Sequence, residues 1–155
     1  MEQYLTAEVK RGAMYFAIVG AVLGIIGAIP LLNCLTLPLL CVSAFAVPLV
    51  IGWLVAQWSG ASEMAKGALP GAIACGIGQA IAGAVTFVAT LCFNVFFSVL
   101  GVTSSGDAAG MMTGLLAAAV AGIASWIFGV IFAAIFGAVG GLLYVAIQGN
   151  KTQPT

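Results

Sequence analysis

Five uncharged polar side chains in the third apolar stretch form the one pattern that suggests binding chemistry. They are Gln79, Thr86, Thr90, Asn94 and Ser98, at intervals of 7, 4, 4 and 4 residues. On a helix of about 3.6 residues per turn they share one slowly winding face. An unpartnered amide is costly in hydrocarbon, so we expect Gln79 and Asn94 to point into a helix bundle. The stripe could line a hydrophilic path or hold a lipid headgroup, but we favour hydrogen bonds between helices.

Ionisable side chains are missing from the apolar stretches. The chain contains no histidine, and every Asp, Glu, Lys and Arg lies outside those stretches. Proton relays, voltage sensors and many ion-coupled transport sites use such groups within the membrane. A Ser/His/Asp set cannot be assembled without histidine, and a glycine-rich phosphate loop with its lysine is not present. We therefore predict that the protein is not an enzyme, a proton pump or a rotor ring.

The cysteines do not suggest a metal or haem centre. Cys34, Cys41, Cys75 and Cys92 are scattered, with no C-x-x-C pair. Most structural zinc sites and iron centres use histidine or clustered cysteine. We predict no metal and no other cofactor. Cys34 and Cys92 should both lie towards the outer side, so a disulfide is possible, although we favour free thiols that pack as small apolar groups.

The composition requires a solvent other than water. Of 155 residues, 63% are hydrophobic and 5% are charged, against roughly 45–50% and roughly 25% in soluble domains. Four apolar stretches, each long enough to cross a hydrocarbon layer of about 30 Å, lie at residues 12–32, 37–58, 67–100 and 110–147. No alternation typical of a membrane β-barrel is present. We predict an all-α membrane protein, a single membrane domain of residues 1–155 with four transmembrane helices.

The basic residues predict the orientation of these spans. Lys10 and Arg11 precede the first span, Lys66 separates the second from the third, and Lys151 follows the fourth. The other two connections, Asn33–Thr36 and Gly101–Ala109, contain no Lys or Arg. Because cytoplasmic loops collect basic residues, we expect a multi-pass protein of the inner (plasma) membrane with both termini in the cytoplasm.

The last two spans are unusually long. Single helices of about 34 and 38 residues would measure roughly 51 and 57 Å, well above the thickness of the hydrocarbon core. We favour tilted, projecting helices over a break at a glycine-rich point, because neither stretch has a polar interruption. Pro48 lies within the second span and should kink it. Pro38 suits the first turn of that helix.

Small residues recur every fourth position in three of the four spans. The fourth contains a row opposite Ile127, Ile131 and Ile135, which should face lipid. This row consists of Ser125, Gly129, Ala133, Gly137 and Gly141, and Gly110, Gly114, Ala118 and Gly122 begin the span in the same way. The other rows are Gly20, Gly24 and Ala28 in the first span, and Ala68, Ala72, Gly76, Ala80 and Ala84 in the third. Such rows could line a pore. We favour the interpretation that they pack helices together through small-xxx-small contacts, as in a glycine zipper.

Two short motifs resemble those of uncharacterised small bacterial membrane proteins with four spans. The stretch "AIPLLNCL", residues 28–35, matches a Pro-Leu-Leu-Asn-Cys turn that closes the first span in that group. "KGALPGAIACGIG", residues 66–78, matches a Gly-Ala-Leu-x-Gly start of the third span. The resemblance covers roughly Lys10–Gly83, and the "TLP" after Cys34 and the long final helices depart from it. It implies a four-span topology and no known activity.

These observations favour a non-catalytic structural or accessory subunit. We expect it to contact membrane lipids and to form a homo-oligomer or bind other membrane subunits, with no role for nucleic acid. One alternative is a passive channel or carrier for a small solute, lined by the polar stripe. Another is a lipid- or pigment-binding scaffold whose aromatic surface is formed by Trp126, Phe128, Phe132 and Phe136.

Overall fold

The chain folds into four long helices. The computed structural model describes the backbone of residues 6–99 and 108–149, and the side chains of residues 6–27, 29, 38, 41–96 and 112–148. This part of the chain contains α1 (Ala7–Ala28), α2 (Pro30–Trp58), α3 (Met64–Val99) and α4 (Ala108–Gly149), and no strand. All four are long and apolar enough to cross a membrane. The predicted all-α, four-span membrane fold is confirmed.

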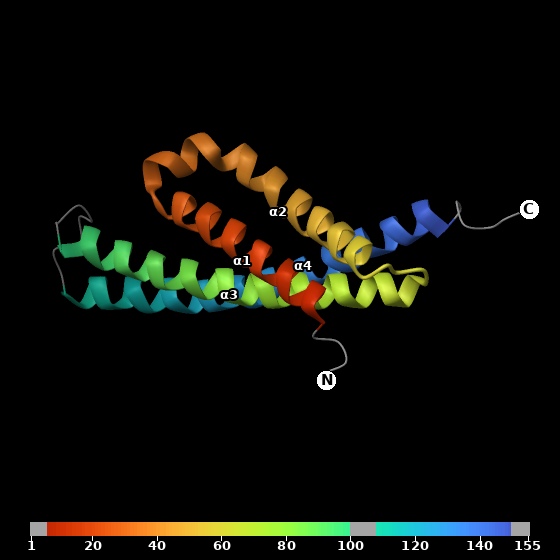
Figure 1. Ribbon diagram of the computed structural model, residues 1–155. Coiled ribbons are helices and arrows are strands. Elements are labelled where there is room, and N and C mark those ends of the chain that lie inside the picture. Colours follow the sequence, from red (N-terminus) through yellow and green to blue (C-terminus); the bar gives the residue numbers. More distant parts are fainter. Residues whose placement is uncertain (1–5, 100–107, 150–155) are drawn as a thin grey trace, which may run out of the picture.

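The helices are arranged as two antiparallel hairpins. Figure 1 shows α1 with α2 as one hairpin and α3 with α4 as the other. The start of α1, the α2–α3 connection and the end of α4 lie towards the same end of the bundle, and the α1–α2 turn lies towards the other (Figure 1). Between the hairpins, α1 packs on α3 and α2 on α4, whereas α1 and α4 make no extended contact.

The turn between α1 and α2 lies earlier than the sequence predicts. The expected connection at Asn33–Thr36 is wrong, because α2 already begins at Pro30. Only Ile29 leaves the helical conformation, with φ −87° and ψ 114°. A residue before proline prefers extended backbone, and a proline at the first helical position has no N–H to leave unpaired. Pro38 consequently lies inside α2 and not in its first turn.

The long helices are unbroken. α3 has 36 residues and α4 has 42, which correspond to about 54 and 63 Å. The expectation of continuous helices over a glycine break is confirmed within the described ranges. α2 remains helical through Pro48 and curves along its length (Figure 1). A proline removes one backbone hydrogen bond and so allows a helix to bend.

Buried residues are confined to one half of the bundle. We call the half with the start of α1, the α2–α3 connection and the end of α4 the dense half, and the other the open half. Every described residue that is buried belongs to the dense half, within residues 9–17, 48–82 and 133–145. Val9, Val55, Ala74 and Cys75 are fully enclosed there. Residues 18–47, 83–96 and 112–132 contain no buried residue among those whose side chains are described.

Candidate functional site

The predicted small-residue row of α4 lies against α3 in the dense half. A Cβ atom on Gly137 would lie 2.5 Å from the carbonyl oxygen of Gly71, and one on Gly141 would overlap the carbonyl group of Gly67. Ala133, in the same row, is buried. Because backbone atoms of two helices touch here, this part of the row is a packing groove that a helix of the same chain fills.

The face of α3 that meets α4 is shifted by one residue from the predicted row. The closest approaches to α4 come from Gly67, Gly71, Cys75, Gln79 and Gly83, each one residue before a position of the predicted row. A Cβ on Gly76 would meet only the Ala134 Cβ, at an ordinary 3.6 Å. The predicted row carries a Cβ at four of its five positions. The observed row offers three glycines, so it permits the closer backbone approach.

The remaining predicted packing glycines approach single side chains on α3. A Cβ on Gly20 would lie 2.8 Å from the Ala82 Cβ, and one on Gly24 would lie 3.0 Å from the Thr86 Cβ. The corresponding atom on Gly122 would lie 2.9 Å from the Phe87 ring, and that on Gly129 would lie 3.0 Å from Nε2 of Gln79. Ser125 is exposed. These four glycines make room for side chains of α3 at the border of the two halves and in the open half.

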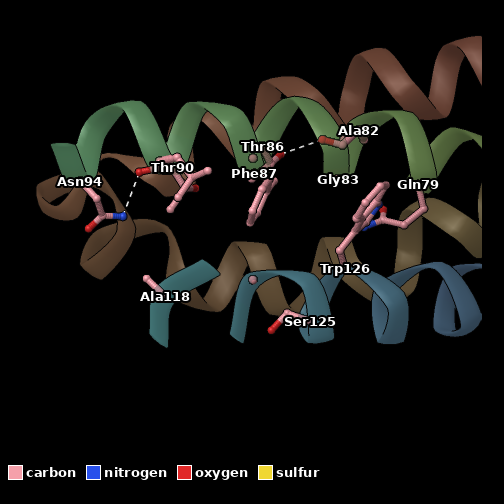
Figure 2. A pocket seen from close by; sticks show the side chains of 14 residues that line it. Gln79, Ala82, Gly83, Thr86, Phe87, Thr90, Asn94, Ala118, Ser125 and Trp126 are labelled. Atoms are coloured by element: carbon pink, nitrogen blue, oxygen red, sulfur yellow. Dashed lines mark hydrogen bonds between the residues drawn. The ribbon is translucent and has the colours of Figure 1, made fainter. Parts of the chain in front are cut away.

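The polar stripe of α3 points into the space between the hairpins. All four described residues of the stripe line the space between α1, α3 and α4. Figure 2 shows Gln79, Thr90 and Asn94 on the side of α3 that faces α4. Thr86 instead approaches Gly24 of α1. The side chain of Ser98 lies outside the described residues. Gln79 and Thr86 are half-buried, whereas Thr90 and Asn94 are exposed.

The hydrogen bonds of this stripe differ from the expectation. Thr86 Oγ1 donates to the carbonyl oxygen of Ala82 at 2.9 Å, and Asn94 Nδ2 donates to that of Thr90 at 2.8 Å. Both acceptors belong to α3, the helix of the donors. Contrary to the prediction, Thr86 and Asn94 therefore do not donate these bonds to another helix. A donor four residues after a carbonyl reaches it without a partner helix, which explains why these bonds form within α3.

Two adjoining cavities begin where the dense half ends and extend into the open half. The first, of about 330 Å³, lies between α1, α3 and α4. The second, of about 490 Å³, is lined by all four helices. We call them the Trp126 cavity and the Pro48 cavity after one residue that lines each. They share five lining residues, Gly20, Gly24, Gln79, Thr86 and Thr90. Three residues of the polar stripe, Gln79, Thr86 and Thr90, therefore border both cavities, and Asn94 borders the Trp126 cavity alone.

Trp126 makes a contact that the sequence analysis missed. Its Nε1 donates to the carbonyl oxygen of Ala80 on α3 at 3.1 Å. Its indole ring covers Gly83, where a Cβ would lie 2.6 Å from Nε1. Figure 2 shows the ring beside Gln79 at one end of the Trp126 cavity. Trp126 lies on α4 and Gly83 on α3, and no residue pattern within one helix indicates that the two face each other. The sequence analysis therefore did not predict this contact.

The proposed aromatic surface on α4 does not form as one surface. Trp126 points towards α3, as described above, whereas Phe128 is 74% exposed. Phe132 and Phe136 instead pack with Phe45 of α2, at centroid distances of 5.2 and 5.3 Å. At about 100° per residue, Trp126 lies roughly 80–160° around α4 from Phe128, Phe132 and Phe136, so the four side chains do not share one face. The predicted exposure of the isoleucine row is observed, since Ile127, Ile131 and Ile135 are 53–56% exposed.

The cavities have an uncharged lining. The described residues around both are apolar or carry neutral hydroxyl, amide or indole groups. Among the described residues no three His, Cys, Asp or Glu side chains are grouped as metal ligands would be. The side chain of Cys34, one partner of the possible Cys34–Cys92 disulfide, lies outside the described residues. The arrangement offers hydrogen bonds and apolar contacts, which suits uncharged ligands.

A comparison with protein families, curated proteins and solved structures found no match to this chain. The resemblance to four-span bacterial proteins therefore remains an expectation.

Proposed function

We propose that this chain is a non-catalytic subunit of the inner membrane that associates laterally, with copies of itself or with a larger membrane assembly. Both termini would lie in the cytoplasm. The orientation is supported by the position of the basic residues, since Lys10 and Arg11 in α1 and Lys66 in α3 belong to the same end of the bundle.

The observation that carries the proposal is a small-residue face on the open half of α4. It consists of Gly114, Ala117, Ala121 and Ala124, which fall within about 80° of one another around the helix. All four are exposed, and no described atom outside the local helix lies within 4 Å of where a Gly114 Cβ would be. The bulky residues Leu116, Val120 and Ile123 lie on other sides of the helix.

The dense half shows what such a face does when a helix covers it. There α4 places Gly137 and Gly141 directly against the backbone of α3. Helices in lipid gain little from burying apolar surface and associate chiefly through close packing over small residues. A face that carries only methyl groups and one glycine gains less from contact with flexible lipid than from a fitted helix. The small-residue face is therefore the part of the described chain best suited to receive one.

The channel alternative draws no support from this arrangement. A path along the polar stripe would have to continue through the dense half to cross the membrane. There the backbone of Gly137 touches that of Gly52 on α2 and that of Gly71 on α3. This contact leaves no room for a solute between those three helices.

Association can be tested by measuring mass in mild detergent. We expect the purified protein to run above its monomer mass of 15.6 kDa, or to retain a second membrane protein. Ala121→Leu should reduce that association at least about fivefold, because one added branched side chain holds a partner backbone away. Ala146→Leu, at an exposed position near the other end of the same helix, is the matched control and should have no effect. A monomeric protein without any partner would contradict the proposal.

A further inference from the structure

The structure assigns a ligand site to the two cavities of the open half: we propose that they bind an uncharged amphiphile, a hydrocarbon chain that ends in a hydroxyl or carbonyl group. This inference goes beyond the proposed lateral association and does not depend on it, because every residue that it uses belongs to one chain.

The polar part of the site is the amide of Gln79. This residue lies where the two cavities adjoin, and no hydrogen bond joins its side chain to another described residue. Thr86 and Asn94 already donate to carbonyl groups of α3. An amide in apolar surroundings has two donors and an acceptor to satisfy, and leaving them unpaired is costly. A ligand hydroxyl could donate to Oε1, while a hydroxyl or carbonyl oxygen could accept from Nε2.

The position of the amide depends on a glycine of the facing helix. Nε2 of Gln79 lies 3.0 Å from where a Cβ of Gly129 would be. An alanine there would push the amide away. The Trp126 ring borders the same place, and its indole N–H is already bonded to Ala80, so of these two groups the Gln79 amide is the one that can bond to a ligand.

The remaining walls suit a hydrocarbon chain. The Pro48 cavity is bordered by Phe16, Leu23, Val47 and Phe132, and its lining is mostly apolar. Its volume of about 490 Å³ falls in the range of small-molecule sites, roughly 300–1,000 Å³. No ionisable side chain lines either cavity among the described residues. A charged headgroup would therefore have no counter-ion, whereas a neutral one needs none.

The bilayer itself has access to this site. α1 and α4 make no extended contact, and the two hairpins diverge in the open half (Figure 1). A molecule dissolved in the hydrocarbon layer can thus enter from the side, without crossing the polar headgroup region. This route favours lipid-soluble ligands over water-soluble ones.

The test uses an eight-carbon alcohol that carries a diazirine on its chain, with the full chain in lipid nanodiscs. Light expels N₂ from the diazirine, and the carbene left behind inserts into a neighbouring C–H, N–H or O–H bond. Fragmentation of the labelled peptides locates each adduct to a residue. We expect adducts on the cavity-lining side chains within residues 79–94 and 118–133. Decanol should compete. Decane, which has no hydroxyl group, should compete about three- to tenfold less well, the range set by one hydrogen bond. Decanoate should also compete less well, because its carboxylate would have no counter-ion in the cavities.

A variant pair assigns the polar contact. Gln79→Leu should reduce labelling of these peptides about three- to tenfold. Gln57→Leu, at an exposed position of α2 away from both cavities, should leave it unchanged. Equal competition by decane, or labelling spread evenly over the lipid-facing Ile127 and Ile131, would overturn the proposal. The competition series needs only the unmodified protein, so it tests the binding of an uncharged amphiphile even if Gln79→Leu does not fold. A monomer that binds the alcohol would contradict lateral association alone.

Discussion

Gly137→Ala should destabilise the bundle by about 1–3 kcal/mol, the usual cost of overpacking a close contact. The new Cβ would lie 2.5 Å from the carbonyl oxygen of Gly71 and 2.7 Å from Sγ of Cys75. Ordinary contact begins near 3.4 Å, so α3 and α4 would have to separate by roughly 0.9 Å at this point. A backbone carbonyl cannot rotate away as a flexible side chain can, and the strain has to spread along both helices.

The matched control for this variant is Gly76→Ala. A Cβ there would meet only the Ala134 Cβ, at 3.6 Å, and alanine is favoured over glycine in a helix by about 1 kcal/mol. We expect this variant to be neutral or more stable. Reversible unfolding by SDS in mixed micelles, followed by circular dichroism, measures both. Equal stability of Gly137→Ala and the unmodified protein would refute the packing register, as would a loss at Gly76 that matches or exceeds the loss at Gly137.

Three further predictions follow from the same geometry. Trp126→Phe removes the hydrogen bond from the indole N–H to the backbone of α3. It should lower the free energy of unfolding by about 1 kcal/mol in the same assay, because hydrogen bonds between membrane helices contribute about 0.6 kcal/mol on average and about 1.7 kcal/mol at most. Cys75 is fully buried and Cys92 is exposed, so a lipid-soluble maleimide should modify Cys92 first and reach Cys75 only after SDS unfolding, as located by peptide mass. For the topology, Ser62→Cys should react with a membrane-impermeant maleimide only from the cytoplasmic side and Ser105→Cys only from outside, and the reverse pattern would contradict the orientation.

Composition was enough to predict the fold class, because so few charges cannot enclose so many apolar residues in water. It was also enough to predict continuous long helices, since no polar interruption occurs in α3 or α4. The α1–α2 turn was misplaced because Asn33 suggested a turn, whereas Pro30 already provides a helix start that costs no backbone hydrogen bond.

The register between helices was the harder problem. The α4 row was predicted from its glycines, and Gly137 and Gly141 do lie in a packing groove. On α3 two adjacent rows both contain small residues, and the choice between them depends on how closely backbones approach. The distance between the two backbones depends on how α3 and α4 pack together, and the residue pattern of one helix alone does not predict it. The same reason hid the contact between Trp126 and Gly83.

The polar stripe was found from its spacing, but its hydrogen bonds were not. Thr86 and Asn94 each bond to the carbonyl four residues earlier on α3, which a side chain at that spacing reaches without a partner helix. The uneven packing that leaves this half open follows from the divergence of the two hairpins. No residue pattern within a single helix predicts that the two hairpins diverge.

The central claim, lateral association through the small-residue face of α4, is tested most directly by photocrosslinking in intact membranes. A photoreactive amino acid is placed at each position from 112 to 125 in turn, and crosslinked protein is identified by mass. We predict strong crosslinks at Gly114, Ala117, Ala121 and Ala124, to one and the same protein, and weak ones at Leu116 and Ile123. Crosslinks to lipid alone at every position, or a pattern that peaks on the bulky side of the helix, would contradict it.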